Sequence, residues 1–516
     1  MLYPIGIQNF EKLREGGYTY IDKTGLIYRL VSTGTYYFLS RPRRFGKSLL
    51  TSTLESYFQG RSDLFEGLAI SGLETEWNEY PVLHIDFSGS AYTSVGEFHK
   101  KLTTMLGRME SEYGLSYDDS DNYGVRLDNI LSAAYKSTGR QVVVLIDEYD
   151  KPIVDNLTDS ELMNAFRVKL QGLYSVLKAN DGKIRFAFLT GVSKIGKMSV
   201  FSGLNNLRDI SMLPEYSSIC GISESELHDY FNESVSELAS NTGETKEECY
   251  AHLKEMYDGY HFCEYSEGMY NPFSLLNTFA GRKYGEYWFE TGTPTLLVDV
   301  MKKTTYDITL LGSQDVAVES LNGVDSIFED PVPLFFQTGY LTVKSYEPMV
   351  GLYTLGFPNR EVKDGFMRFM IRYYLNTSNA STSVARVMKM KLCLFRGDAC
   401  GFMSELESVF SGISYQIQGD VEKDFQYAMY IILELVGLDV EVERTTSNGR
   451  IDMVIKTKDY IYIIEIKTDS SADAALQQIE DRGYARPFAS DSRKLYRIGV
   501  SFSTGTRRIE DWKVLD

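Results

Sequence analysis

The stretch that decides the fold of the carboxyl-terminal part of the chain reads RIDMVIKTKDYIYIIEIK, residues 450–467. Its β-branched residues form two short runs around a polar turn, which predicts two neighbouring strands. In the second run Glu465 and Lys467 are two residues apart, so both project from the face that carries Ile463. An acid and an amine on such a core face are costly unless they are paired or bind a cation. Asp452, at the same depth on the first strand, supplies a second carboxylate.

Two carboxylates and a lysine form a group suited to phosphodiester chemistry. The carboxylates of Asp452 and Glu465 make a hard oxygen site for Mg²⁺, and Lys467 can position a water or neutralise a phosphorane-like transition state. The alternative interpretation is a surface ion pair between Glu465 and Lys467. Upstream, Glu422 opens an apolar helix that ends at Gly437. Downstream, a helix running from Ala475 to Tyr484 and a last strand from Leu495 to Phe502 are expected.

This order of elements resembles the PD-(D/E)xK nuclease superfamily over roughly the last hundred residues. The resemblance implies an α/β nuclease-like domain in which Asp452 and Glu465 hold the metal and Lys467 assists catalysis. It also implies that the helix-borne residues Glu422 and Gln478 belong to the catalytic set. Whether such a site is active stays open at this point.

A second informative stretch reads YYFLSRPRRFGKSLL, residues 36–50, and predicts an apolar strand, a loop and the start of a helix. Gly46, Lys47 and Ser48 match the end of a P-loop, where backbone amides hold phosphates, the lysine reaches the β- and γ-phosphates, and the hydroxyl binds Mg²⁺. Arg41 stands where the pattern has its first glycine. Together with Arg43 and Arg44 it fills the loop with cations, which suits an anion site.

About a hundred residues later, the run QVVVLIDE at 141–148 predicts a buried parallel strand that ends in two acids. Open α/β sheets bind ligands at the carboxyl ends of their strands. Asp147 is therefore expected to hold Mg²⁺ through water and Glu148 to polarise the attacking water. Thr190 follows a third apolar run, Ile184 to Leu189, at the place of a γ-phosphate sensor. The alternative is that Asp147 and Glu148 only cap a following helix.

These motifs, with the blocks at 20–24, 189–195, 257–260, 270–277 and 287–289, closely resemble the AAA-ATPase-like family of bacterial proteins. Members often carry a carboxyl-terminal PD-(D/E)xK domain, and an arginine for the first P-loop glycine is usual among them. The resemblance implies an α/β fold with a parallel P-loop core, and ATP and Mg²⁺ as cofactors. The implied nucleotide-binding residues are Arg43, Arg44, Phe45, Gly46, Lys47, Ser48, Asp147 and Thr190, with Ser48 and Asp147 at the metal. AAA-type sites often take an arginine from a neighbouring subunit, and Arg208 is a candidate.

Composition fits a cytoplasmic protein of several domains. The chain has 516 residues and five cysteines without a C-x-x-C pair, which indicates reduced thiols. No amino-terminal signal segment or apolar run of about 20 residues is present, so no membrane partner is expected. The net charge of −18 argues against nucleic acid, yet residues 482–513 hold eight basic and three acidic side chains. That strip is either a surface for the phosphate backbone or a solvated charged edge.

The expected layout has four parts: a P-loop core at 1–215, a helical lid at 216–290, a connecting region of mixed structure at 291–415, and the nuclease-like domain at 416–516. In the lid, Ser223 and Glu226 have the spacing of a capping box, and a helix is expected from Thr245 to Tyr257. In the connecting region, a strand is expected from Gly339 to Ser345 and an exposed loop from Asn376 to Ser383.

The sequence thus predicts an ATP-binding and ATP-hydrolysing switch joined to a metal-dependent nuclease, with nucleic acid, DNA before RNA, as the partner. One alternative is a nucleotide-regulated module whose nuclease fold only binds nucleic acid or protein. Another is a signalling ATPase with a protein partner alone. The substrate's identity and sequence specificity, the oligomeric state and the biological role stay open.

Overall fold

The computed structural model describes residues 1–195, 201, 206–291, 300, 304, 306, 308–322, 329–375, 380–411, 429–433, 435, 439–446, 449–506 and 508–516. The chain divides into two compact units, Met1–Lys363 and Asp364–Asp516, and each has its own central sheet. No helix among the described residues is both long enough and apolar enough to span a bilayer.

The sheet of the first unit has five parallel strands in the order β2-β3-β4-β1-β5. The strands are β1 (Tyr36–Ser40), β2 (Val82–Asp86), β3 (Val142–Asp147), β4 (Ile184–Gly191) and β5 (Arg208–Asp209). The three strands expected from the apolar runs are present as β1, β3 and β4, so the α/β class with a parallel P-loop core is confirmed. β4 lies between β1 and β3, so the loops after these three strands meet at one edge of the sheet.

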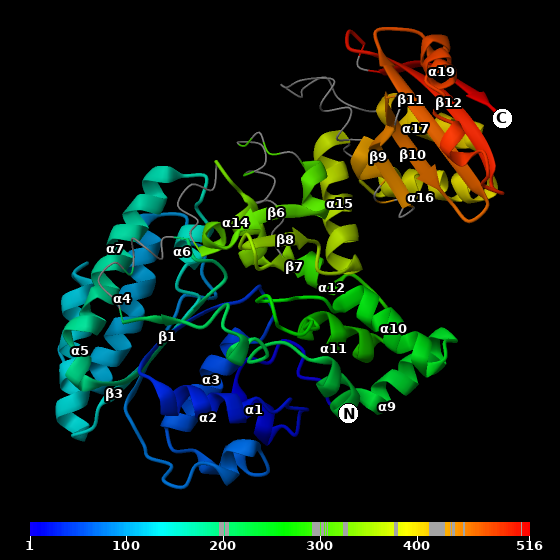
Figure 1. Ribbon diagram of the computed structural model, residues 1–516. Coiled ribbons are helices and arrows are strands. Elements are labelled where there is room, and N and C mark those ends of the chain that lie inside the picture. The colour runs from blue at the N-terminus through cyan, green and yellow to red at the C-terminus, as the bar shows by residue number, and fades with distance from the viewer. Residues whose placement is uncertain are drawn as a thin grey trace. The chain divides into compact units, whose positions relative to one another are not determined.

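Helices cover both faces of this sheet. α4 (Val95–Glu112), α5 (Tyr123–Thr138) and α7 (Ser160–Ala179) pack against one another, as the cyan ribbons in Figure 1 show. α3 (Lys47–Phe58) packs on β2, β3 and β4. The shorter helices of this region are α1 (Phe10–Glu15), α2 (Thr24–Thr33) and α6 (Lys151–Val154).

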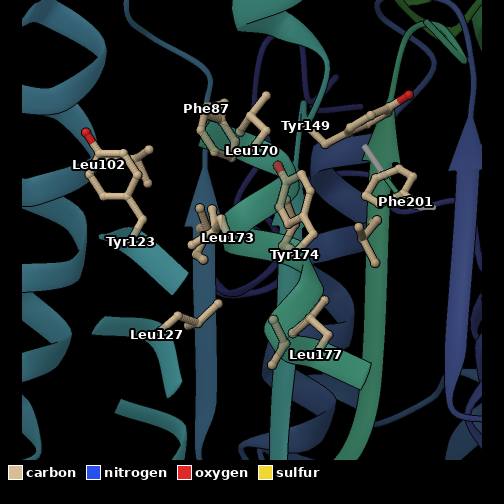
Figure 2. Packing of buried hydrophobic residues seen from close by; sticks show 14 of the residues in the cluster. Phe87, Leu102, Tyr123, Leu127, Tyr149, Leu170, Leu173, Tyr174, Leu177 and Phe201 are labelled. Carbon is tan, nitrogen blue, oxygen red and sulfur yellow. The ribbon is translucent and has the colours of Figure 1, made fainter. Parts of the chain in front are cut away.

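The main core of the first unit lies between the sheet and α4, α5 and α7 (Figure 2). Tyr149, Tyr174 and Phe201 lie close together there, with ring centres of Tyr149 and Tyr174 at 5.0 and 5.2 Å from that of Phe201. Tyr149 comes directly after the acids at the end of β3. Its burial therefore fixes the loop that carries Asp147 and Glu148.

The segment expected as a lid is helical. It contains α9 (Glu224–Thr242), α10 (Lys246–Tyr257), α11 (Pro272–Gly281) and the short α12 (Tyr287–Thr291). The capping box of Ser223 and Glu226 is confirmed, and Thr245 with Glu248 forms another at the start of α10. α9, α10 and α11 share a core of their own that includes Leu253.

The rest of the first unit holds a small antiparallel sheet in the order β6-β8-β7. Its strands are β6 (Gln314–Ala317), β7 (Thr342–Glu347) and β8 (Leu352–Gly356), and α14 (Val332–Thr338) precedes β7. The strand expected from Gly339 therefore begins three residues later. The reason is that Gly339, at φ +90°, ends α14 in the left-handed conformation and cannot open an extended strand.

The second unit has a five-stranded mixed sheet in the order β13-β12-β11-β10-β9. Its strands are β9 (Asp439–Thr446), β10 (Gly449–Lys456), β11 (Tyr460–Thr468), β12 (Lys494–Ser503) and β13 (Arg508–Leu515). Only the β11–β12 pair is parallel. The strand expected from Leu495 to Phe502 is present as β12. A further strand, β13, was not predicted, because its charged residues hide the alternation of an edge strand.

Further helices are α15 (Arg360–Leu375), α16 (Ala380–Arg396), α17 (Ala399–Ser411) and α19 (Ala472–Asp481). The expected loop from Asn376 to Ser383 is wrong in its second half, because α16 begins at Ala380. Val387, Met390 and Leu394 are buried at helical spacing, and this packing overrides the local preference of the serines and threonines. Glu422, expected to open a helix, lies outside the described residues.

Candidate functional site

A cavity of about 420 Å³ lies in the first unit beside the start of α3. Its lining comes from the amino-terminal segment Pro4–Gln8, the phosphate loop at 43–48, the acids after β3, and the helical lid through residues such as Phe273. This volume lies in the range of small-molecule sites, about 300 to 1,000 Å³. The phosphate loop, the acids and the lid predicted from separate motifs thus meet around one space.

The phosphate loop leads directly into α3. Gly46 is the N-cap residue at φ +93°, a conformation that glycine adopts without strain, and the backbone turns there into the helix. The Nζ of Lys47 is buried and donates to the carbonyls of Arg41 and Pro42, at 2.9 and 3.1 Å. Burial lowers the pKa of Lys47, while the carboxylates of Glu148 and Asp147 act in the opposite sense. Ser48, on the first turn, also lines the cavity.

The acids after β3 take different positions. Asp147 is buried, and its Oδ1 accepts hydrogen bonds from the Thr190 hydroxyl and from the Glu148 amide, the latter at 3.1 Å. Glu148, at φ +53°, turns into the cavity lining, and burial raises the pKa of its carboxyl group. Thr190 is fully buried beside Asp147, and neither of these two predicted residues is part of the cavity lining.

Asp150 is a cavity residue that the sequence analysis did not single out. Its carboxylate is buried and accepts from the amides of Val192 and Ser193, at 3.2 and 2.6 Å, and from the Ser193 hydroxyl at 2.7 Å. It thereby ties the loop after β3 to the loop after β4. Gly191 permits the contact, since a Cβ there would lie 2.6 Å from Asp150. The signal was present in the sequence as a further acid two residues after Glu148.

Arg41 does not add a cation to the phosphate site, in contrast to what the sequence suggested. Its guanidinium is buried, donates to the carbonyls of Ser211 and Tyr216 at 2.7 and 3.1 Å, and lies over the ring of Phe262. Arg43 and Arg44 do line the cavity. Arg208, the candidate for donation to a neighbouring subunit, is half exposed on β5 and pairs with Glu215 at 2.6 Å.

In the second unit, β10 and β11 bring Asp452 and Glu465 side by side. The register pairs Met453 with Ile464, so the next step along the ladder places the two acids opposite each other. The Oδ2 of Asp452 accepts a hydrogen bond from the Ile466 amide at 2.8 Å. The Nζ of Lys467 lies 3.6 Å from Oε1 of Glu465. The three residues predicted to share a site are therefore neighbours.

Glu465 is the most perturbed residue of this group. It is 1% exposed, and its buried Oε2 has no hydrogen-bond partner among the described residues. Burial, and next the Asp452 carboxylate, raise the pKa of Glu465 to about 7, while Lys467 acts against the rise. A buried acceptor without a partner carries a desolvation penalty that a bound cation would remove. Because Glu465 is buried, the interpretation as a surface ion pair with Lys467 is wrong.

Helix α19 closes one side of this group. Gln478 donates through Nε2 to Glu465 and lies 3.4 Å from the Tyr484 hydroxyl. The helix approaches the sheet at Gly499, the β12 partner of Glu465, where a Cβ would lie 2.4 Å from the carbonyl oxygen of Ala472. A glycine at this register position therefore allows Gln478 to reach the acid.

Among the described residues, no group of three or more acidic, histidine or cysteine side chains is arranged to hold a metal ion. Asp452 and Glu465 form a pair, and Glu422, the third expected acid, lies outside the described residues. The donor set of two carboxylates with an unpartnered buried oxygen fits a hard divalent cation such as Mg²⁺, whose remaining ligands are usually water or substrate oxygens.

Four of the eight basic residues in the strip expected at 482–513 form ion pairs with acids. Lys513 pairs with Asp473, Arg493 with Asp491, Lys494 with Asp516, and Arg497 with Glu480. These pairs favour the interpretation as a solvated charged edge over a continuous phosphate-binding surface.

Fold and sites define an α/β protein with a P-loop ATPase-like unit and a nuclease-like unit. The family model described as "Predicted AAA-ATPase" matches residues 4–201, and that of the PD-(D/E)XK nuclease superfamily matches residues 420–512. The "Uncharacterized protein in vnfD 5'region" of Azotobacter chroococcum mcd 1 is 36% identical over 518 residues, which cover 98% of this chain and 97% of that protein. The chain belongs to this AAA-ATPase-like family, with a carboxyl-terminal PD-(D/E)XK domain.

Among solved structures, the chain is similar to one titled "Structure of the Aeropyrum Pernix ORC2 protein (ADPNP-ADP complexes)". The match has 12% identity, covers 67% of this chain and 92% of that chain, and has a TM-score of 0.24. A score this low supports no argument about fold or function.

Proposed function

We propose that the protein is an ATP-binding and ATP-hydrolysing switch coupled to a metal-dependent nuclease that cuts nucleic-acid phosphodiesters, DNA before RNA. The observation that carries the nuclease part is Glu465, a buried carboxylate beside Asp452 and Lys467, with one oxygen that has no hydrogen-bond partner in the part of the chain that the structure describes. A purely structural acid in a sheet would be expected to have both oxygens satisfied.

In this proposal, Asp452 and Glu465 hold Mg²⁺. A divalent ion there would polarise the scissile phosphate and lower the pKa of a bound water. Lys467 supplies a positive charge to the phosphate oxygens as negative charge develops on them. Gln478 keeps Glu465 in place, and the Ile466 amide does the same for Asp452.

The ATPase part rests on the cavity around the phosphate loop. The α3 start offers backbone amides and Lys47 to the phosphates. Ser48, which lines the cavity, and Asp147, which is buried at the end of β3, are the residues suited to Mg²⁺. Glu148 is the carboxylate in the cavity lining that can accept a proton from the attacking water. Thr190 and Asp150 position the loop that carries these acids.

The test is to incubate the purified protein with plasmid, linear DNA and RNA in Mg²⁺ or Mn²⁺, with and without ATP. Cleavage by the wild type that is lost in Asp452→Ala and in Lys467→Ala, with ATP binding retained in both, supports the proposal. Salt-sensitive DNA binding without cleavage would select the module that only binds. Neither binding nor cleavage would leave an ATPase that acts on protein.

A further inference from the structure

Arg44, at the tip of the phosphate loop, has a backbone conformation that is unfavourable for its residue type. Its φ is +67°, in the left-handed region where glycine is usual and where another residue is destabilised by roughly 1 to 2 kcal/mol. Gly46, two residues later in the same loop, also has a positive φ. Local strain of this kind is concentrated at ligand-binding sites.

The Arg44 side chain is exposed and lies against the lid. Its guanidinium carbon is 4.9 Å from the ring centre of Phe273 in α11, and both residues line the cavity. The preceding residue, Arg43, also contacts the helical segment, because its carbonyl accepts a hydrogen bond from Nε1 of Trp288 at 2.9 Å. The tip of the loop thus meets the lid at two points, one through backbone and one through a charged side chain.

The three lysines around the cavity are already held by stronger partners. Lys23 pairs with Glu226 at 2.5 Å, Lys151 pairs with Asp155 at 2.7 Å, and Lys47 is bonded to loop carbonyls. Within the described part of the chain, Arg44 makes no ion pair, and its contact is the aromatic ring. An exposed cation–π contact contributes about 0.5 to 1 kcal/mol, less than a bidentate arginine–phosphate interaction. The guanidinium would therefore bind a phosphate in the cavity in preference to the ring.

We propose that Arg44 is an arginine supplied in cis to the γ-phosphate of ATP, and that Phe273 holds it while no γ-phosphate is present. The inference rests on the proposed ATPase function and extends it. On ATP binding the Arg44 side chain leaves Phe273 in α11, and after hydrolysis it returns. The contact between the loop and α11 therefore depends on whether a γ-phosphate is bound. The contribution of an arginine from another subunit, for which Arg208 was the candidate, is then not required.

The assignment also gives Arg44 a part in the chemistry. In hydrolysis a water oxygen bonds to the γ-phosphorus while the bond from that phosphorus to the β–γ bridging oxygen breaks. One water proton leaves to Glu148 and then to solvent, and ADP and phosphate are the products. Negative charge grows on the departing oxygen, and a guanidinium that contacts the phosphates stabilises it.

The experiment compares Arg44→Ala, Arg44→Lys and a matched control, Arg140→Ala. Arg140 is likewise an exposed arginine over an aromatic ring, 6.0 Å from Tyr80, and does not line the cavity. Calorimetry gives the Kd of ADP and of a non-hydrolysable ATP analogue, and steady-state kinetics give kcat and KM. Arg44→Ala should raise the Kd of the ATP analogue about 10-fold or more and keep the Kd of ADP within about 3-fold of the wild type. It should also lower kcat about 100-fold. Arg44→Lys should fall between, and Arg140→Ala should match the wild type.

A further variant, Phe273→Leu, tests the ring. Without the competing aromatic face, the affinity for the ATP analogue relative to ADP should rise about 3-fold, a ratio in which contacts to the rest of the nucleotide cancel. An unchanged ratio overturns the role of Phe273. If Arg44→Ala lowers the affinity for both nucleotides equally, or behaves like the control, the assignment of Arg44 is overturned. If the wild type neither binds nor hydrolyses ATP, the proposed function itself fails.

Discussion

At the scale of single residues, Glu465 is the residue whose environment is most informative. The folded protein raises its pKa from 4.5 to about 7, so it binds the proton more tightly than the unfolded chain does. This contribution to stability is fully present below pH 4.5 and is lost as the pH rises through 7. A metal ion competes with that proton, so metal binding is expected to tighten over the same interval.

The first prediction concerns Glu465→Gln in metal-free buffer. The variant removes the buried charge, so at pH 8 its free energy of unfolding should exceed that of the wild type by up to about 3 kcal/mol. Near pH 4.5 the two proteins should be alike, because the wild-type carboxyl group is then protonated. Urea unfolding followed by circular dichroism at both pH values measures the difference. An exposed acid of the same unit, changed in Glu480→Gln, provides the control. A variant less stable than the wild type at pH 8 would contradict the account.

The second prediction concerns Lys47. Lys47→Ala removes the one lysine at the start of α3, and the Kd for ATP should rise about 10- to 100-fold, in line with the loss of a charge-assisted hydrogen bond. Lys169→Ala, which removes a partly buried lysine paired with Asp121 away from the cavity, should leave the Kd unchanged. Calorimetric titration with ATP and Mg²⁺ decides the point, and equal affinity in the two variants would remove Lys47 from the site.

At the scale of elements, packing of α19 on the sheet determines whether Gln478 reaches Glu465. Gly499 allows this approach, because a Cβ would lie 2.4 Å from the Ala472 carbonyl and 2.8 Å from Cγ of Leu476. The helix itself is fixed at its start by Ser471, whose hydroxyl accepts from the Ala474 amide. A small change in a strand can therefore displace a side chain on a helix.

The third prediction follows from that approach. Gly499→Ala should push α19 away from β12, destabilise the second unit by about 1 to 3 kcal/mol and lower cleavage, while ATP binding stays normal. Gly505→Ala is the matched control, since the nearest atom to its Cβ would be 3.7 Å away. Thermal unfolding and a plasmid-nicking assay check both effects. Wild-type cleavage by Gly499→Ala would show that the position of α19 is unimportant.

The sequence predicted the elements that carry strong apolar patterns and missed those formed by tertiary packing. The parallel strands were readable because Val142–Asp147 and its neighbours are buried on both faces. β13 was not, because most of its side chains are exposed and charged. The start of α16 was predicted as a loop, because the residues there favour a loop and only the packed face, with Val387 and Met390, shows the helix.

At the scale of the whole molecule, the proposed switch and the proposed chemistry lie in different compact units, Met1–Lys363 and Asp364–Asp516. The candidate residues of each site could be predicted because their spacing reflects backbone geometry: a helix start after a strand at Lys47, and alternation along a strand at Glu465 and Lys467. Phe273 could not, because its place depends on a helix that approaches from elsewhere in the chain. Asp150 was missed although the sequence shows it as a further acid two residues after Glu148.

The fourth prediction follows from this separation. Asp452→Ala should abolish cleavage and leave the Kd for ATP within about 2-fold of the wild type, since the sites share no described residue. Lys47→Ala should keep a basal level of cleavage and lose its response to ATP. Parallel titration and nicking assays on both variants test this. Loss of ATP binding in Asp452→Ala would show that the units are not independent.

The most direct test of the central claim is the rate at which Glu465→Gln nicks supercoiled plasmid in Mn²⁺, measured beside the wild type and Glu480→Gln. The account predicts that Glu480→Gln cuts within about 2-fold of the wild type, whereas Glu465→Gln cuts at least about 1,000-fold more slowly, because a metal-bound carboxylate supports the chemistry. Cleavage by Glu465→Gln at the wild-type rate would contradict the assignment of this site as the nuclease centre.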